Sequence, residues 1–473
     1  MIICIGKLKN GFLTDLLHVY TFGGLLMVIQ FFSFKNMKFL NYIFYSLIYF
    51  SSIFAQTWHP LHYQQLEDHI HHNPNFEMID SLARNNVTVN NRNSSLSHEV
   101  IGYLPYWEYE KYTDIDYELI TQINYFSIEL DQYGNIENDH NWPNLYLVEY
   151  AQSRGVKVKL CATLFGYDNL TTLLSSQQNR QNAWINLANL VVMQNADGID
   201  INFELLPQDQ KENLVIFMEG LSATLNMVID NPILTMATPA IDWNDAWDYN
   251  QLASIVDGLF IMGYNYFYSG STSAGPVSPL GGYLYDIDFT INDYLSKTNN
   301  QNDKLILGLP YYGYNWPVLN EQINSFTIDL GQPVTYEQSL DLSYTYGQNY
   351  DYESNAQWLS YQNSSSWMQC WYDDSLSLSH KYQFALDNEL AGIGIWALGY
   401  DNNDPKMWGA ISDKFRNPFF GDINFDGIVN IIDIVILMNM ILGIEEINSN
   451  ADINNDGFIN VLDIMEIVFL ITN

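Results

Sequence analysis

Basic residues are scarce in this chain of 473 residues, in which 18 Lys and Arg stand against 54 Asp and Glu, for a formal net charge of −36. So acidic a chain repels nucleic acids and anionic membrane surfaces, and this disfavours both as partners. Cysteine is scarce too: only three are present, with no Cys-x-x-Cys pair and no Cys/His spacing typical of zinc sites. Cys161 and Cys370 either pair in an oxidising compartment or stay as two buried thiols, and the sequence leaves both alternatives open.

The N-terminal residues have the features of a secretory signal. Residues 37–55 combine a basic start, an apolar run and a small alanine at the end. We therefore expect Met37 to be the true initiator, residues 1–36 to be an over-called start, and the mature protein to be secreted, either extracellular or on the cell surface. Two membrane spans are the alternative, which Asp15 and His18 disfavour because they interrupt the first apolar run.

Residues 56–98 are rich in Asn, His and Ser and show no regular apolar period. We expect a solvated leader or linker here. A metal site built from the clustered histidines is the alternative, which no ordered framework in the sequence supports.

Over residues 99–415, short apolar runs alternate with longer amphipathic stretches. Eight such runs, separated by helical stretches such as 179–194, 208–229 and 376–389, predict an α/β fold, a (β/α)₈ TIM barrel. A doubly wound open sheet is the competing fold, but no Gly-rich phosphate loop supports it. Residues 313–370 are too long for one crossover and predict a small α+β insertion beside the active-site face. The eight runs span 100–106, 119–128, 156–164, 197–204, 233–240, 255–264, 304–312 and 392–398.

The fourth run, DGIDINFE at 197–204, carries its polar residues in a pattern that packing alone does not explain. Side chains alternate faces along a strand, so Asp200, Asn202 and Glu204 share the inner face. Buried polar groups are unfavourable unless they bond to one another or to a ligand. Glu204 lies at the carboxyl end of the strand, where barrel enzymes keep their catalytic groups. Asp197 falls on the opposite face, and we expect it to be structural.

This string resembles the DxxDxDxE signature of glycoside hydrolase family 18, which includes chitinases and related N-acetylhexosaminidases. Further motifs that look like those of the family follow in the same order over most of 99–415. They are GYLPYW at 102–107, INYFSIELDQYGNI at 123–136, MGYNYF at 262–267, LGLPYYGYNW at 307–316, QCWYDD at 369–374 and GIGIWALGYD at 392–401.

The resemblance implies substrate-assisted, retaining hydrolysis, in which the acetamide oxygen of the sugar attacks the anomeric carbon and forms an oxazolinium-like intermediate. In that scheme Glu204 is the acid, while Asp200 and Asn202 tune its protonation and orient the acetamide. Tyr264 would hydrogen-bond the acetamide carbonyl, and Trp396 would lie beneath the reacting sugar. The resemblance adds Tyr103, Trp107, Met262 and Asn265 as residues that contact substrate, although packing explains Tyr103 and Trp107 equally well.

Two positions depart from the family pattern. The family's last Asp before the acid is Asn202 here, and its Asp after the motif tyrosine is Asn265. An Asn still accepts a hydrogen bond, but it lacks the negative charge that would stabilise a cationic intermediate and keep Glu204 protonated. We therefore expect a shifted pH optimum or a lower rate.

The C-terminal region contains two copies of a calcium-loop pattern, DINFDGIVNIID at 422–433 and DINNDGFINVLD at 452–463, 30 residues apart. Oxygen-bearing residues fall at positions 1, 3, 5, 9 and 12 of each copy, with a glycine at 6 and a backbone carbonyl at 7. We expect each loop to bind one Ca²⁺. The predicted ligands are Asp422, Asn424, Asp426, Ile428, Asn430 and Asp433 in the first loop, and Asp452, Asn454, Asp456, Phe458, Asn460 and Asp463 in the second.

An apolar helix is expected after each loop, and the whole of 416–473 resembles a type I dockerin, a module that docks enzymes onto cohesin-bearing scaffolds. The resemblance implies a cohesin partner or another cell-surface protein. It also points to Ile431-Ile432 and Val461-Leu462 as a hydrophobic docking face.

The leading hypothesis is thus a secreted glycosidase that acts on N-acetylglucosamine-containing glycans, with chitin or chito-oligosaccharides first. A peptidoglycan or N-glycan hydrolase of the same fold is the second. A non-catalytic, lectin-like chitin-binding protein is the third, because the same fold can serve either role.

Overall fold

The computed structural model describes residues 17–22, 25–30, 60–85, 96–364, 366–417, 421–424, 428–448, 450–454 and 456–472. Strands β1 (Leu17–Phe22) and β2 (Leu25–Gln30) pair as an antiparallel hairpin within a unit formed by residues 1–60. The expected signal at 37–55 lies outside the described residues and stays a prediction. Within the described ranges, no helix is long and apolar enough to cross a membrane.

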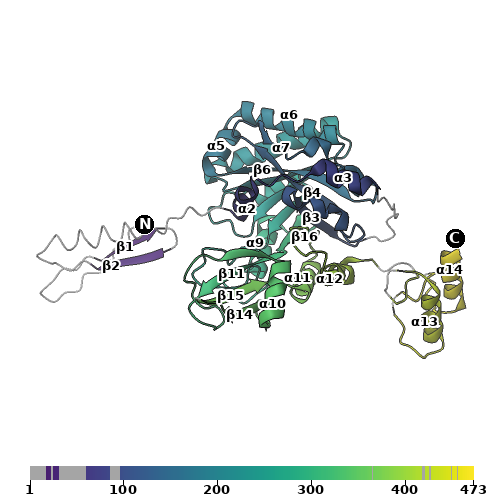
Figure 1. The fold of residues 1–473 in the computed structure, drawn as a ribbon. Coiled ribbons are helices and arrows are strands. Elements are labelled where there is room, and N and C mark those ends of the chain that lie inside the picture. The colour runs from purple at the N-terminus through teal and green to yellow at the C-terminus, as the bar shows by residue number, and fades with distance from the viewer. Residues whose placement is uncertain are drawn as a thin grey trace, which may run out of the picture. The chain divides into compact units, whose positions relative to one another are not determined.

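Eight parallel strands close into a barrel, as the sequence predicts (Figure 1). β3 pairs with β4 on one side and with β16 on the other, and this double pairing closes the sheet. All eight predicted runs form barrel strands, in chain order around the barrel. They are β3 (Glu99–Pro105), β4 (Gln122–Leu130), β6 (Lys157–Phe165), β7 (Gly198–Glu204), β8 (Ile233–Pro239), β9 (Gly258–Met262), β10 (Leu305–Pro310) and β16 (Gly392–Trp396). The short β5 (Ile136–Asn138) adds to the edge of β4.

Helices surround the strands and cover their outer faces. Phe203, on the outer face of β7, packs against Phe217 of α7 with ring centroids 5.3 Å apart, so the alternation of side chains along β7 is as expected. Asp197 precedes the strand and binds Lys157 and the backbone of Val158, in the structural role expected for it. The outer helices are α4 (Leu147–Gln152), α5 (Tyr167–Ser175), α6 (Gln177–Gln194), α7 (Lys211–Val228), α8 (Tyr249–Ile255), α9 (Ile287–Lys297), α11 (Ser375–Asp387) and α12 (Pro405–Phe415). A longer 3₁₀ helix spans Tyr106–Asp114, and short 3₁₀ turns lie at Trp142–Asn144, Gln208–Gln210 and Asn302–Lys304.

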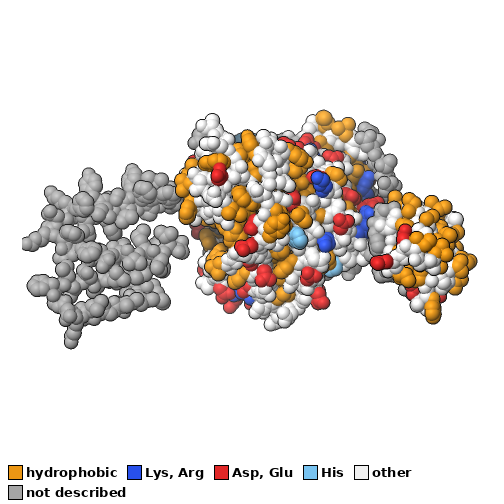
Figure 2. All heavy atoms as spheres, turned by 90° about the horizontal axis from the view of Figure 1, so that it is seen from below, with side chains coloured by type: hydrophobic (Ala, Val, Ile, Leu, Met, Phe, Trp, Pro, Cys, Tyr) orange, Lys and Arg blue, Asp and Glu red, His pale blue; other side chains and the backbone are white. Residues whose placement is uncertain are grey.

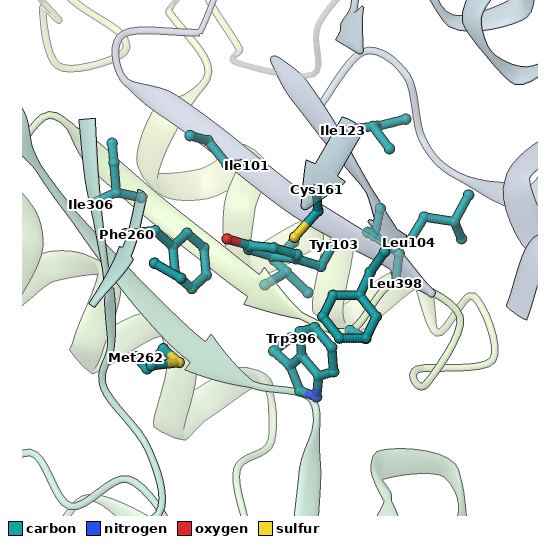
Figure 3. Close-up of a cluster of buried hydrophobic side chains, with 14 of the residues drawn as sticks. Ile101, Tyr103, Leu104, Ile123, Cys161, Phe260, Met262, Ile306, Trp396 and Leu398 are labelled. Atoms are coloured by element: carbon teal, nitrogen blue, oxygen red, sulfur yellow. The ribbon is translucent and has the colours of Figure 1, made fainter. Parts of the chain in front are cut away.

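The barrel interior is a packed core (Figure 3). Phe260 of β9 fills its centre, and its ring lies directly against two glycines, one in β10 and one in β16. A Cβ added to Gly308 or Gly394 would come within 2.3 Å or 1.9 Å of its ring. Tyr103 packs edge-on against Phe260 at 4.8 Å, and Cys161 lies nearby. Cys161 is a buried free thiol, and Cys370, in the insertion, is another. Because the interior is filled, a ligand has to bind at one end of the barrel, and barrel enzymes use the end at which the carboxyl ends of the strands lie.

The insertion between the seventh and eighth barrel strands forms a five-stranded antiparallel sheet with one helix, in the order β12-β11-β15-β14-β13. The run 325–330, whose residues alternate in polarity, makes only isolated bridges and forms no strand. The elements are β11 (Tyr312–Val318), β12 (Gln332–Thr335), α10 (Tyr336–Tyr346), β13 (Asn349–Asp351), β14 (Ala356–Gln362) and β15 (Trp367–Tyr372).

The segment expected to be a solvated leader is folded where the structure describes it. Helices α2 (Leu61–His69) and α3 (Phe76–Asn85) pack against the barrel. Leu61, Leu66 and Phe76 join its hydrophobic core. The expectation of a solvated segment was therefore wrong for 61–85, because this short apolar pattern is hidden in an Asn- and His-rich background.

The C-terminal region has a hydrophobic core of its own. α13 (Ile431–Ile441) and α14 (Val461–Thr472) each follow one of the repeated loops, as the sequence predicts. Their core contains Ile423, Leu437, Met440, Ala451, Ile453 and Ile467.

Candidate active site

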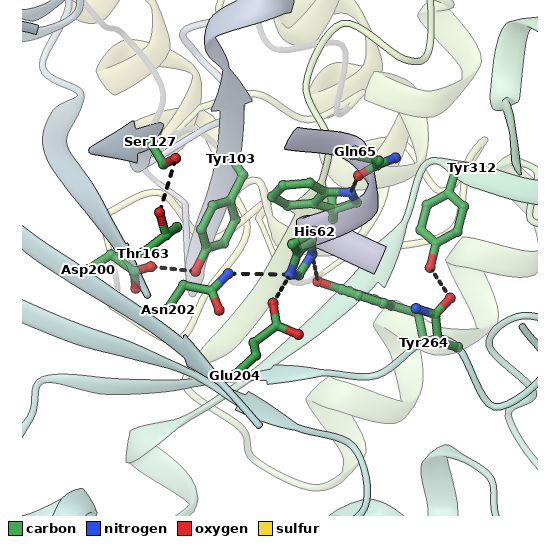
Figure 4. Close-up of polar contacts among 12 residues, drawn as sticks. His62, Gln65, Tyr103, Ser127, Thr163, Asp200, Asn202, Glu204, Tyr264 and Tyr312 are labelled. Atoms are coloured by element: carbon green, nitrogen blue, oxygen red, sulfur yellow. Dashed lines mark hydrogen bonds and ion pairs between the residues drawn. The ribbon is translucent and has the colours of Figure 1, made fainter. Parts of the chain in front are cut away.

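The deepest polar group on the inner face of β7 is Asp200, which is fully buried and fully bonded (Figure 4). Its two oxygens accept hydrogen bonds from the Tyr103 hydroxyl and the Thr235 hydroxyl, each at 2.6 Å. Lys159 in turn donates to Thr235 at 2.6 Å. Burial lowers the pKa of Lys159 to about 8, although nearby Asp200 opposes the shift. Asp200 is thus fixed in orientation from below and supported by a buried cation.

Glu204 occupies the end of the same strand, two residues beyond Asn202. Its side chain is only 11% exposed, and Oε1 lies 2.6 Å from Nδ1 of His62 on α2. The Asn202 amide nitrogen lies 3.3 Å from the same His62 nitrogen. Asn202 Oδ1 is buried and has no hydrogen-bond partner among the described residues, so one acceptor beside the acid is left for a ligand donor.

Tyr264 follows β9 and completes the polar wall of the site. Its hydroxyl lies 3.2 Å from Nε2 of His62. Burial, with the negative charges of Glu204 and Asp200 nearby, holds the pKa of Tyr264 well above its usual value, so this hydroxyl keeps its proton and can act as a donor. Asn265 has a left-handed backbone, with φ of 61°, and its side chain accepts a hydrogen bond from Tyr312 at 2.6 Å. Tyr312 therefore fixes Asn265, while Met262 lines the nearby barrel wall.

Trp396, at the end of β16, forms an aromatic wall beside these polar groups. The His62 ring packs on it at 3.9 Å between centroids, and its indole N–H donates to the Gln65 side chain at 3.0 Å. Trp107 is stacked nearly parallel on His69 at 4.4 Å and donates to the Tyr400 hydroxyl. Tyr103 lies deeper, bound to Asp200, and so contributes to positioning that carboxylate.

The structure thus brings Glu204, Asn202, Tyr264 and Trp396 around a single point, and that point holds His62. Sequence reasoning missed His62, Gln65, Lys159 and Thr235. The first two left one signal: residues 62, 65 and 69 share the spacing of one helix face.

The repeated C-terminal loops have closely matching geometry where they are described. Position 12 of each loop is buried and closes it, since Asp433 accepts from the backbone N–H groups of residues 423, 424 and 430. Asp463 does the same with residues 453, 454 and 460. Asp426, one predicted ligand, lies outside the described residues. No three His, Cys, Asp or Glu residues converge as metal ligands in the parts of the chain that the structure describes.

Comparison with known proteins gives two family matches. The model described as glycosyl hydrolases family 18 matches residues 99–401, and the model described as dockerin type I domain matches residues 420–468.

Among curated relatives, the putative sporulation-specific glycosylase YdhD of Bacillus subtilis is 26% identical over 321 residues, which cover 64% of this chain and 73% of that protein. Probable chitinase 2 of Drosophila melanogaster is 27% identical over 274 residues, which cover 50% of this chain and 54% of that protein.

A solved GH18 chitinase from Cycas revoluta, in complex with (GlcNAc)₃, superposes with a TM-score of 0.61 at 19% identity, over 67% of this chain and 99% of that one. This likeness supports the fold. The family match spans the whole barrel and includes the acidic strand that ends in Glu204. The chain therefore belongs to glycosyl hydrolase family 18 and is a glycoside hydrolase with a C-terminal type I dockerin domain.

Proposed function

We propose that this protein hydrolyses β-linked N-acetylglucosamine polymers, with chitin or chito-oligosaccharides as the first substrates, and that Glu204 is the general acid. The observation that carries the proposal is that the bonded Asp200 lies on the same strand as Glu204, while Glu204, the Tyr264 hydroxyl and the Trp396 ring all surround one point, the His62 side chain. The chitinase names among the relatives and the (GlcNAc)₃ complex agree with it.

The proposed chemistry uses the substrate's own acetamide as nucleophile. Glu204 donates its proton to the glycosidic oxygen as the bond to the anomeric carbon breaks, and the acetamide oxygen attacks that carbon. Tyr264 donates to the acetamide carbonyl, while the unpaired Asn202 Oδ1 accepts from the acetamide N–H. Water then attacks the anomeric carbon, Glu204 recovers a proton, and the product keeps its configuration.

A bacterial cell-wall glycan is the second candidate substrate. The relative named a sporulation-specific glycosylase favours it, since that relative aligns over 64% of this chain. Asn202 also favours this candidate, because it stands where the family's chitinase motif has Asp.

Product analysis on chitin oligomers, peptidoglycan and high-mannose glycans tests these substrates side by side. We expect shorter chito-oligosaccharides, with the β-anomer formed first in NMR spectra, and no products from Glu204→Gln. Cleavage of peptidoglycan alone would favour the second candidate. If chito-oligosaccharides reach the site and bind there, but no glycan is cleaved, the result would favour the lectin-like alternative.

We further propose that the C-terminal domain binds two Ca²⁺ ions and docks onto a cohesin-bearing scaffold outside the cell. The donors fit a hard cation: each repeat offers carboxylate, amide and backbone carbonyl oxygens at the spacing of a calcium loop. Asp422, Asn424, Asp426, Ile428, Asn430 and Asp433 would hold one ion, and Asp452, Asn454, Asp456, Phe458, Asn460 and Asp463 the other. When bound, the cation would offset repulsion among these carboxylates.

The proposed docking face is apolar and exposed. Ile431, Ile432, Val461 and Leu462 are 71%, 51%, 62% and 49% exposed. Figure 2 shows many hydrophobic side chains on the surface of this domain. Surface of this kind on a small domain marks an interaction site. Pull-down with recombinant cohesins tests it, and the Ile431→Ser and Val461→Ser pair should abolish capture.

A further inference from the structure

We propose that helix α2 is an intrachain inhibitor that occupies the catalytic site, and that His62 takes the place of the reacting acetamide group. α2 belongs to the segment 61–85, which also contains α3. This inference rests on the proposed function only where it says which substrate group His62 replaces. That His62 covers Glu204 is a feature of the structure and does not depend on the proposed substrate.

One face of α2 carries the side chains that contact Glu204 and the groups around it. His62, Gln65 and His69 are spaced three and four residues apart, so they lie on the same side of the helix. His62 contacts Glu204, Asn202, Tyr264 and Trp396. Gln65 accepts from the Trp396 indole, and His69 stacks on Trp107. The opposite side, with Glu67 and Asp68, is exposed.

These contacts leave no room for a sugar ring. The His62 side chain is 3% exposed, the Glu204 side chain 11%, and Trp396 is completely buried. A pyranose that reaches Glu204 must occupy the volume now filled by the imidazole. Substrate and helix therefore compete for the same place, and the structure is that of the closed state.

The chemistry of the imidazole matches what it replaces. Imidazole is a planar five-membered ring with two polar atoms separated by one carbon, as is the oxazolinium ring that the proposed reaction forms. Nδ1 lies beside Glu204 and Asn202, and Nε2 lies beside the Tyr264 hydroxyl. In the proposed reaction Asn202 and Tyr264 hold the acetamide nitrogen and oxygen, so the imidazole contacts the same two side chains that the acetamide would contact, with Glu204 as a third partner.

α3 stays on the barrel and so keeps α2 close to the site when α2 is displaced. Asp80, which is buried, accepts hydrogen bonds from the Tyr109 and Tyr112 hydroxyls and from the Tyr146 backbone N–H. Arg84 lies over the Tyr146 ring at 4.0 Å. A tethered helix has a high effective concentration at the site, so a soluble ligand must compete against it.

The test uses the full chain and a variant in which His62→Ala and Gln65→Ala are combined. Asp68→Asn, on the exposed face of the same helix, is the matched control. A closed state that excludes substrate raises the apparent KM and leaves kcat unchanged. Loss of a hydrogen bond to a charged group changes an equilibrium by at least about 10-fold. We therefore expect the double variant to lower KM for chito-oligosaccharides by about 10-fold or more at constant kcat, and the control to match the parent chain.

Calorimetric binding separates this inference from the proposed function. If the double variant binds chito-oligosaccharide at least about 10-fold more tightly but cleaves nothing, the helix is an inhibitor and the proposed hydrolysis fails. If both chains cleave with equal KM, the glycosidase stands and the inhibitor is refuted. A fall in kcat in the double variant would make His62 a part of the catalytic machinery, which also overturns the inference.

Hydrogen exchange of the unaltered chain guards against a variant that misfolds. Saturating chito-oligosaccharide should increase exchange of the α2 amides at 61–69, while the amides of α7, on the outside of the barrel, keep their protection. An α2 that remains protected with ligand bound would show that ligand and helix occupy different places, and would refute the inhibitor.

Discussion

Replacing Glu204 with Gln is expected to separate hydrolysis from binding. The substitution keeps the size of the side chain and removes the proton that the proposed mechanism delivers. A general acid contributes about 10²–10⁴-fold to a rate, so kcat should fall by about that factor. Thermal unfolding should be little changed, because Glu204 lies at the end of β7 and does not contribute to the barrel core.

The same substitution acts on α2, because Glu204 bonds His62 at 2.6 Å. A hydrogen bond to a charged group contributes about 1.5–3 kcal/mol, against about 0.5–1.5 kcal/mol for a neutral one. The difference, about 1 kcal/mol, shifts the balance between closed and open states by roughly 5-fold. Oligosaccharide should therefore bind Glu204→Gln a few-fold more tightly than the parent, while its hydrolysis nearly stops.

The assay measures product formation by chromatography and ligand binding by calorimetry on the same preparations. Glu219→Gln, on the exposed face of α7, is the control for loss of a negative charge and should behave as the parent. A Glu204→Gln chain that keeps half of the parent's turnover would refute the assignment of Glu204 as the acid. Weaker ligand binding in that variant would refute the reasoning about His62.

Three further predictions follow from particular residues. Asn202→Asp, measured in the chain that also carries His62→Ala and Gln65→Ala, should raise kcat or move the pH optimum upward. The reason is that a second carboxylate favours the protonated form of Glu204 and stabilises the cationic intermediate. A lower kcat at every pH would contradict this prediction. The C-terminal domain should unfold separately in calorimetry of the full chain, and its transition temperature, unlike that of the barrel, should rise with Ca²⁺ and fall with chelator. At 100-fold excess over the dissociation constant, each bound ion should add about 2.7 kcal/mol to the free energy of unfolding. A transition that ignores chelator would contradict the calcium loops. Burial raises the pKa of Asp401 to about 6 from its usual 3.8, so the folded state keeps a proton that the unfolded chain loses, and stability falls as pH rises between these values. Asp401→Asn should thus leave the free energy of unfolding unchanged at pH 3 and raise it by up to about 3 kcal/mol at pH 8, as urea titration would show; equal stabilisation at both pH values would contradict the shift.

The barrel was predictable because each of its strands carries its own local signal. Residues 199–204 alternate strictly between apolar and polar, and the structure confirms that Phe203 faces the helices while Asp200 faces inward. The order of the eight runs then allows few topologies, since parallel strands with short crossovers close in chain order.

The contacts of the site with α2 were not predictable in the same way. His62 lies 142 residues before Glu204, and no local pattern connects the two. The segment 56–98 is dominated by Asn, His and Ser, a composition that usually indicates solvated chain. α2 is short, and its folding depends on partners such as Trp107 and Trp396 that only the finished barrel provides. Lys159 and Thr235 were missed for a related reason, because they act through Asp200 and carry no motif of their own.

The two unusual features of this chain, Asn202 in place of the family's Asp and His62 within the site, meet at one atom. Nδ1 of His62 lies 2.6 Å from Glu204 and 3.3 Å from the Asn202 amide nitrogen. An Asp at 202 would put a second carboxylate beside the same imidazole and hold a protonated ring more firmly. Asn202→Asp should therefore raise KM in the full chain, in which α2 competes, although it raises kcat once α2 is disabled. A neutral residue at 202 thus weakens the chemistry and at the same time keeps the helix displaceable. If Asn202→Asp leaves KM of the full chain unchanged, the Asn is a feature of the chemistry alone and has no part in the release of α2.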